Sequence, residues 1–317
     1  YNNDEFFDGT IDEVAVYDVS LSNETIKQLY QRTWYDHSPQ IFLLHPEHAE
    51  EVDNSTDTTG NTTLLLHFDD GFGSTTANDS STQVNDGTLA GNTFFTNDSI
   101  SGSAVAFDGN NDFINISATG LSFGDGTLDS PFSVSAWVKL NSNSAGQKIV
   151  SKYRDTSGAQ RREWIFSFNG DQGPELAIYD ESADAARARR DTGPVMSAGE
   201  WHYVVGTYDG TRTYSGLKVY VDGVRVDDAD ANFGTTGTYT AMEASIQPVY
   251  IGMFISSGYN PTSDFDGFID EVRVVNYTLT QAQIAADYRK GAKGLFGTSD
   301  GELPTTDPYS TGVRRQP

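Results

Sequence analysis

Short runs of alternating apolar and polar residues, separated by glycine-containing turns, recur through most of this chain. Residues 132–138 and 201–208 alternate with the two-residue period of a strand that buries one face. Residues 217–221 alternate in the same way, meet an Asp-Gly turn at 222–223 and return as 224–226, which predicts a β-hairpin. Many such strands predict an all-β fold, a two-sheet antiparallel jelly-roll sandwich.

Further strands and one short helix complete the predicted elements. The four residues Asp108–Asn111 predict a hairpin turn between two of the strands. Thr280 and Gln283 form a capping box for a peripheral helix after the last strand, and we expect that helix to end near Gly291. The additional strands are expected at residues 64–68, 104–107, 112–116, 249–252 and 269–275.

One segment occurs twice. Residues 7–32 align without a gap on residues 265–290, an offset of 266 − 8 = 258, and 11 of the 26 positions are identical. Each copy reads as a strand, a turn and a short helix. We therefore expect four parts: residues 1–35, the closing strand and helix of a preceding or partner domain; residues 36–61, a linker; residues 62–291, a complete jelly roll; and residues 292–317, an extended tail.

The first copy has three possible placements. It could belong to a preceding domain of a tandem array, or fold on its own jelly roll as an extra edge strand. It could also add its strand to another subunit, which would give head-to-tail assembly. In that case Ile11, Val14, Val16 and Tyr17 are the apolar residues of the assembly strand.

Charge and composition narrow the function classes. A formal net charge of −25 opposes binding to DNA, RNA or an anionic membrane surface, and suits a secreted or calcium-binding protein. Cysteine is absent, which excludes disulfides and thiolate chemistry. No apolar run approaches the roughly 20 residues of a membrane span. Seven sequons predict a glycosylated surface protein, at Asn23, Asn54, Asn61, Asn78, Asn97, Asn115 and Asn276.

Seven landmarks in order identify a family. Residues 62–290 resemble a laminin-G-like jelly roll of the concanavalin A-like lectin/glucanase superfamily. The landmarks are Leu65–Gly71, Asn85–Leu89, Val105–Gly109, Phe132–Val138, Glu200–Val204, Val219–Gly223 and Phe265–Val272. The resemblance implies one concave and one convex sheet, often with a structural Ca²⁺, and it leaves the ligand open because the fold hosts lectins, hydrolases and adhesion modules.

The resemblance also implies where Ca²⁺ would bind. In relatives, an Asp on the final strand joins backbone oxygens from the first strand and a following turn, and Asp270 holds the matching place. The expected contributors from the other two segments are Asp69, Asp70, Gly71, Asp108 and Asn111. The alternative is that these residues only form turns in an acidic protein.

A carbohydrate-binding face would need exposed aromatic rings beside polar side chains. Trp137 and Trp201 lie in the strand motifs and are expected in the core. Trp164 and Tyr179 lie on middle strands that could form the concave sheet, and Arg154 could supply a polar contact. The alternative is ordinary packing.

Catalysis is not expected. Retaining glucanases of this superfamily carry two Glu and an Asp alternating on one strand, and this chain has no such run. We therefore expect a non-enzymatic extracellular or cell-surface structural or adhesion protein whose partners are copies of itself or neighbouring laminin-G-like domains. The alternative is a carbohydrate-binding module of a larger secreted enzyme or adhesin.

Overall fold

The computed structural model describes residues 60–117, 120–142, 146–154, 162–168, 173–190, 196–227, 232–233, 238–255, 261–262 and 264–296. The first repeat copy with Ile11, Val14, Val16 and Tyr17, most of the predicted linker, the sequons at Asn23 and Asn54, and the tail after residue 296 lie outside these ranges. No helix among the described residues is both long enough and apolar enough to cross a lipid bilayer.

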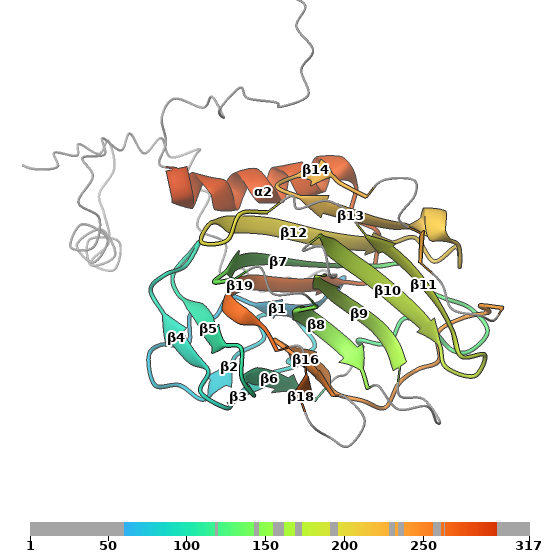
Figure 1. Ribbon diagram of the computed structural model, residues 1–317, viewed down its shortest axis with the longest axis horizontal. Helices are drawn as coiled ribbons and strands as arrows, with labels where there is room; N and C mark the ends of the chain where they lie inside the picture. Colours follow the sequence, from blue (N-terminus) through green and yellow to red (C-terminus); the bar gives the residue numbers. More distant parts are fainter. Residues whose placement is uncertain are drawn as a thin grey trace, which may run out of the picture. The chain divides into compact units, whose positions relative to one another are not determined.

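Two antiparallel sheets make up the domain, as predicted (Figure 1). The eight-stranded sheet has the order β14-β13-β12-β7-β19-β5-β4, with β1 also paired to β19. Its strands are β1 (Thr62–Leu66), β4 (Phe94–Thr96), β5 (Ala104–Asp108), β7 (Phe132–Leu140), β12 (Trp201–Tyr208), β13 (Leu217–Val221), β14 (Val224–Arg225) and β19 (Asp266–Val275).

The second sheet has nine strands in the order β15-β11-β10-β9-β8-β16-β6-β3-β2. They are β2 (Thr76–Ala77), β3 (Gly87–Ala90), β6 (Phe113–Ile116), β8 (Lys148–Tyr153), β9 (Arg162–Phe168), β10 (Pro174–Asp180), β11 (Ala185–Arg190), β15 (Asn232–Phe233) and β16 (Val249–Ile251). The pair β17 (Phe254–Ile255) and β18 (Pro261–Thr262) forms a separate two-stranded ribbon, and a short 3₁₀ helix, η2, spans Tyr214–Gly216.

The core lies between the two sheets because their strands alternate as the sequence predicts. Phe132, Val134 and Ala136 of β7 are fully buried in it, and Trp164 and Phe166 of β9 face them from the other sheet. The Phe132 ring lies 5.5 Å from the Trp164 ring. Burying each large apolar side chain contributes roughly 1.5–3 kcal/mol, so this layer is the main source of stability.

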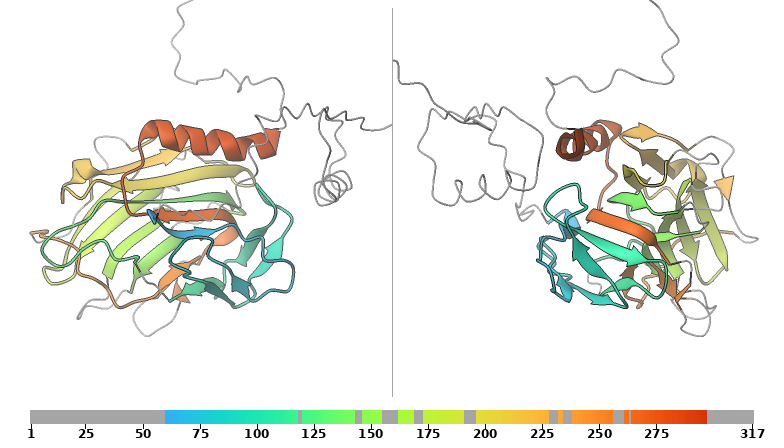
Figure 2. Two further views of the ribbon diagram at one scale, coloured as in Figure 1. Left: turned by 180° about the vertical axis from the view of Figure 1, so that it is seen from behind. Right: turned by 60° about the vertical axis from the view of Figure 1, so that its left-hand side comes forward.

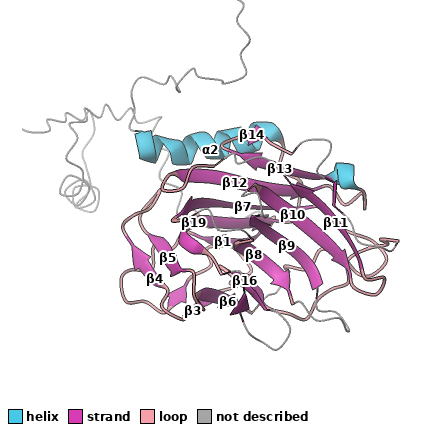
Figure 3. Ribbon diagram, in the orientation of Figure 1, coloured by secondary structure: helices cyan, strands magenta, loops and turns pink. Residues whose placement is uncertain are grey.

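Helix α2 (Gln281–Phe296) covers the outer face of the eight-stranded sheet (Figure 2). Trp137 is buried there as expected, stacked on Tyr288 at 5.7 Å. The capping box is confirmed, since the Thr280 backbone N–H donates to Gln283 Oε1 (2.9 Å) and the Gln283 N–H donates to Thr280 Oγ1 (3.3 Å). Apart from η2, α2 is the one described helix, and strands and loops make up the rest (Figure 3).

The expected end of the helix at Gly291 is wrong, because α2 continues to Phe296. Gly291 is needed for close packing instead of for termination. A Cβ atom at this position would overlap the Trp137 ring, so only glycine lets the helix approach the sheet this closely.

The two predicted hairpins have different outcomes. The turn at Asp222-Gly223 joins the paired strands β13 and β14, and both residues have positive φ (52° and 80°), as a type I′ turn requires. The hairpin predicted at Asp108–Asn111 is wrong, because β5 and β6 belong to different sheets. The buried Asp112 carboxylate fixes this crossing by accepting the backbone N–H groups of Asp108 (2.8 Å) and Asn92 (2.5 Å).

The second copy of the repeat provides the central strand of its sheet. β19 pairs along one side with β7 and along the other with β5 and then β1. Its register shifts between Asp270 and Arg273, where Glu271 has a φ of 50°. This strand therefore ties the beginning, middle and end of the domain together.

Candidate functional site

The outer face of the nine-stranded sheet carries an apolar cluster that is separate from the core. Along β9 and β10, Trp164, Phe166 and Ile178 point into the core, so the alternate residues Ile165 and Ala177 point to the opposite face. Ile165 and Ala177 form the floor of this second cluster.

Three aromatic side chains pack against Ile165 and Ala177. They are Tyr153, Tyr179 and Phe254, and we call them the aromatic patch. The Tyr153 ring lies 4.7 Å from that of Tyr179 and 5.4 Å from that of Phe254. Tyr153 is largely buried at 9% exposure, while Tyr179 and Phe254 are half-buried and reach the surface. Phe254 comes from β17, which lies beside β8 through the bridge between Arg154 and Ile255.

Cationic side chains flank the aromatic patch. The Arg162 guanidinium lies 5.8 Å from the centre of the Tyr179 ring, and Lys148 Nζ lies 5.4 Å from that of Phe254. Arg154 is 7% exposed. Burial lowers the pKa of Lys148, and the nearby carboxylate of Glu175 partly offsets that effect. Aromatic rings bordered by hydrogen-bond donors form the combination that suits sugar rings.

The residues predicted to bind carbohydrate lie on opposite faces of the nine-stranded sheet. Tyr179 lies in the aromatic patch and Arg154 lies beside it. The prediction for Trp164 is wrong: its ring is fully buried in the core and its Nε1–H donates to the Leu121 carbonyl (3.0 Å). Tyr153 and Phe254 were not predicted from the sequence. β8 shows no alternation that would mark Tyr153, since its pairing with β9 changes register between Lys152 and Tyr153, and Phe254 lies on a two-residue strand that is too short to show a pattern.

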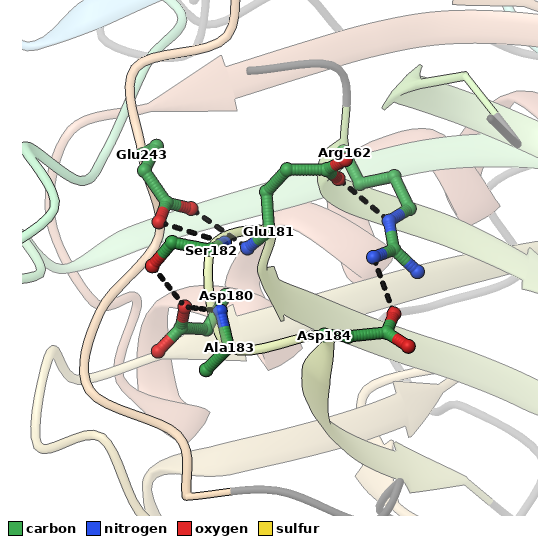
Figure 4. A network of polar contacts seen from close by, with 7 residues as sticks. All are labelled: Arg162, Asp180, Glu181, Ser182, Ala183, Asp184 and Glu243. Carbon is green, nitrogen blue, oxygen red and sulfur yellow. Dashed lines mark hydrogen bonds and ion pairs between the residues drawn. The ribbon is translucent and has the colours of Figure 1, made fainter. Parts of the chain in front are cut away.

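A network of carboxylates positions Arg162 (Figure 4). Its Nε–H donates to Glu181 Oε2 and its Nη2–H to Asp184 Oδ1, each at 2.6 Å. Burial alone would lower the pKa of Arg162, but these two contacts outweigh it and raise the pKa, so the guanidinium stays charged. Glu243 accepts the backbone N–H groups of Glu181 (2.7 Å) and Ser182 (3.0 Å), which fixes the turn that carries both carboxylates.

Glu243 belongs to an irregular segment, residues 239–247, which we call the strap. Carboxylates from three other segments bind its backbone. Asp180 accepts the Thr240 N–H (2.6 Å), Asp129 accepts the Met242 N–H (2.8 Å) and Glu163 accepts the Ser245 N–H (3.0 Å). The strap is therefore held without strand pairing.

Glu163 has the most unusual carboxyl group near the site. Burial raises its pKa to about 7, and the nearby charge of Lys152 counteracts that rise. A carboxyl group with such a pKa can act as a general acid in glycosidases. Here, however, it is 0% exposed and its oxygens accept the N–H of Phe123 (2.6 Å) and the hydroxyl of Ser122 (3.1 Å) in addition to the strap.

The residues predicted to bind Ca²⁺ fall in two places. Asp270 and Asp69 hold the same loop: Asp270 Oδ2 accepts the N–H groups of Ile100 (2.8 Å) and Ser101 (3.2 Å), and Asp69 Oδ1 accepts that of Ser103 (2.7 Å). Asp270 is 0% exposed, and its burial raises its pKa well above the ordinary value, with a further contribution from Glu271.

The other four residues predicted to bind Ca²⁺ make contacts in other places. Asp70 accepts the Asn78 N–H (3.2 Å), and Gly71 is exposed in the adjacent turn. Asp108 and Asn111 lie at the far end of β5, where the Asn111 N–H donates to Asp264 (2.7 Å). The structure thus does not bring all six residues together.

A calcium ion at Asp270 would draw most of its ligands from backbone oxygens. Among the residues that the structure describes, no three His, Asp or Glu side chains are placed to hold a metal ion. Asp69 and Asp270 could contribute two carboxylates, and Ca²⁺ accepts backbone carbonyls for the rest. The binding of calcium stays a prediction.

The five sequon asparagines within the described ranges are all exposed. They are Asn61, Asn78, Asn97, Asn115 and Asn276. Their glycosylation stays a prediction.

Comparison with known proteins gives a family and a fold. The family model of the concanavalin A-like lectin/glucanases superfamily matches residues 108–285, more than half of the 317 residues. No curated protein matches the chain.

Three solved structures are similar to the chain, and the two with TM-scores above 0.5 show the same kind of sandwich. The receptor binding domain of botulinum neurotoxin D has a TM-score of 0.52 at 12% identity, over 73% of this chain and 53% of that one. The serotype G binding domain has a TM-score of 0.51 at 14% identity, over 73% and 51%. Domain 4 of a GH43 extracellular arabinanase from Geobacillus stearothermophilus, solved with arabinotriose, has a TM-score of 0.49 at 20% identity, over 71% and 97%. The chain thus spans about half of each toxin domain.

Proposed function

The chain belongs to the concanavalin A-like lectin/glucanase superfamily, and from that premise we propose that it is a non-enzymatic carbohydrate-binding module of a secreted or cell-surface protein. The aromatic patch, with its flanking cations, is the observation that carries the proposal. Tyr179 and Phe254 present apolar ring surface for the C–H faces of a sugar, and Lys148 and Arg162 supply donors for its hydroxyl groups.

The carboxyl groups near the aromatic patch make structural contacts, which supports a non-enzymatic role. A glycosidase needs two carboxyl groups facing each other across the scissile bond. Glu163 is enclosed by its hydrogen-bond donors, and Glu181, whose side chain is 4% exposed, is paired with Arg162. Both carboxyl groups hold structure, so we propose that the sugar is bound and not cleaved.

The composition supports a location outside the cell. The chain has a formal net charge of −25, which suits a protein surface in saline surroundings.

A glycan array with variants tests the binding proposal. We expect Tyr179→Ala and Phe254→Ala each to reduce affinity at least fivefold, because an aromatic contact contributes about 1 kcal/mol beyond its buried area. The matched control is Phe94→Ala, since Phe94 is 59% exposed on β4 of the other sheet. An array on which the wild type binds no glycan, with or without Ca²⁺, would contradict the proposal.

A second function, self-association, is favoured by the repeat. In the second copy, Ile269, Val272 and Val274 are completely buried, and Ile284 of α2 is as well. The first copy has the identical residues, Ile11, Val14, Val16 and Ile26. We propose that residues 7–32 can take the place of β19 and α2 in another copy or in a neighbouring laminin-G-like domain.

Light scattering over a range of concentrations tests the self-association. We expect the full chain to form oligomers whose mass rises with concentration, and a chain lacking residues 1–35 to be monomeric. The double variant Val14→Asp and Val16→Asp should behave like the deletion, because charged residues cannot enter the core. A full chain that is monomeric at the highest concentration reached would overturn this second function.

A further inference from the structure

Arg162 has hydrogen-bonding capacity beyond the two contacts that position it. A guanidinium group carries five N–H donors in a planar fork, and the contacts to Glu181 and Asp184 use two of them. The Arg162 side chain is 13% exposed, so part of the fork reaches the surface beside the aromatic patch. Such a fork matches the geometry of a carboxylate.

The two carboxylates on Arg162 differ greatly in exposure. The Glu181 side chain is 4% exposed, while that of Asp184 is 78% exposed. The Asp184 carboxylate keeps most of its contact with solvent, so a ligand carboxylate can replace it on Arg162 more easily than it can replace the buried Glu181. Glu181 is the permanent partner because its backbone N–H is also held by Glu243 (2.7 Å).

The backbone of Asp184 has a left-handed conformation. Its φ is 48°, a region that Asp adopts in turns more readily than most L-residues do. The turn from Glu181 to Asp184 is closed by the Asp184 N–H to Glu181 carbonyl contact (3.3 Å) and fixed by Glu243 through Ser182. The turn thus presents an exposed carboxylate to Arg162 in a fixed position.

We propose that Arg162 binds the carboxylate of a uronic acid unit in the glycan, and that Asp184 occupies this position until the glycan displaces it. The inference rests on the proposed function, since the uronic acid ring would lie on Tyr179 and Phe254. A carboxylate is the favoured anion because the displaced group is itself a carboxylate on the same nitrogen atom.

The net charge of −25 works against any anionic ligand at long range. Salt screens such repulsion beyond about 8 Å at physiological ionic strength, so the contacts at the site decide the affinity. Lys148, at 5.4 Å from the Phe254 ring, adds a second cation at the other side of the patch.

Calorimetric titration with galacturonic acid oligosaccharides and with neutral galactose oligosaccharides of equal length tests the inference. We expect the wild type to prefer the acidic ligand by roughly tenfold, as a charge-assisted hydrogen bond contributes about 1.5–3 kcal/mol. Asp184→Asn should raise the affinity for the acidic ligand about two- to fivefold relative to the affinity for the neutral ligand, because it removes the competing charge. Arg162→Lys, which keeps the charge but loses the fork, should remove most of the preference.

Glu200→Gln is the matched control, because it removes one exposed carboxylate directly before β12, a strand of the other sheet. Equal affinity for the two ligands, or an Asp184→Asn effect no larger than that of Glu200→Gln, would overturn the inference while leaving the proposed function intact. Failure of both ligands and of every array glycan to bind would contradict the proposed function itself.

Discussion

Buried and half-buried carboxylates hold the irregular parts of this fold. Asp129 is an example: it accepts the Met242 N–H and the hydroxyl groups of Tyr208 (2.6 Å) and Tyr239 (2.7 Å). Loops cannot use the hydrogen-bond ladder of a sheet, so their backbone donors need other acceptors. Burial raises the pKa of Asp129, as it does for Glu163, so these contacts link stability to pH.

The pH dependence of stability that comes from Glu163 has a direction that can be measured. Its pKa rises from 4.5 to about 7 in the folded chain, so the folded state binds the proton more tightly than the unfolded state. Stability from this group is therefore present below pH 4.5 and is lost as the pH rises through 7, by about 3 kcal/mol in total. Urea unfolding at pH 5 to 9 should show wild-type stability falling over this range, with a smaller fall for Glu163→Gln. Equal pH dependence of the two proteins would contradict the raised pKa.

Helix α2 illustrates how an element is positioned by one close contact. Gly291 lets the helix lie directly on the Trp137 ring, which in turn packs on Tyr203 at 5.3 Å. Propensity alone would favour alanine at a helix interior position by about 1 kcal/mol. The contact with the ring reverses that preference.

We therefore expect Gly291→Ala to destabilise the domain by roughly 1–3 kcal/mol through overpacking. The control, Arg289→Ala, changes an exposed position of the same helix and should alter stability by less than about 0.5 kcal/mol. Urea unfolding of both variants measures the difference. A stabilising Gly291→Ala would show that α2 does not approach Trp137 in this way.

The elements themselves show what the sequence can predict. Alternation located β7, β12 and β13 because every second residue of each strand points into the core between the sheets, although the other face is largely buried as well. Alternation did not predict that the chain crosses from one sheet to the other at Asp108–Asn111. A hairpin turn within one sheet and a connection between two sheets favour the same turn-forming residue types, so the sequence does not distinguish them. It also could not assign Trp164 to a face, because β9 contains a register shift next to Tyr153 and carries aromatic or aliphatic residues on both sides.

In the whole molecule, three parts of the sandwich have three different roles. The space between the sheets provides stability, α2 covers one outer face, and the aromatic patch occupies the other. The fold was predictable because it depends on the period of many strands. The site was predictable only in part, because Phe254 and the turn of Asp184 depend on contacts between segments far apart in the sequence.

Calcium binding near Asp270 would act on the whole domain, because β19 is its central strand. If the ion binds, a concentration 100 times the Kd should stabilise the fold by about 2.7 kcal/mol. A domain of this size should then melt roughly 5–10 °C higher in CaCl₂ than in EGTA. MgCl₂ is the ion control, and Asp270→Asn should remove the shift. Identical melting temperatures in CaCl₂ and EGTA would contradict the calcium prediction.

A crystal structure with an oligosaccharide selected on the array would show whether the outer face of the nine-stranded sheet binds carbohydrate. We expect a sugar ring against Tyr179 and Phe254, with Arg162 within hydrogen-bonding distance of it. A sugar bound on the eight-stranded sheet, or at the loops at either end of the sandwich, with the aromatic patch empty, would contradict this expectation.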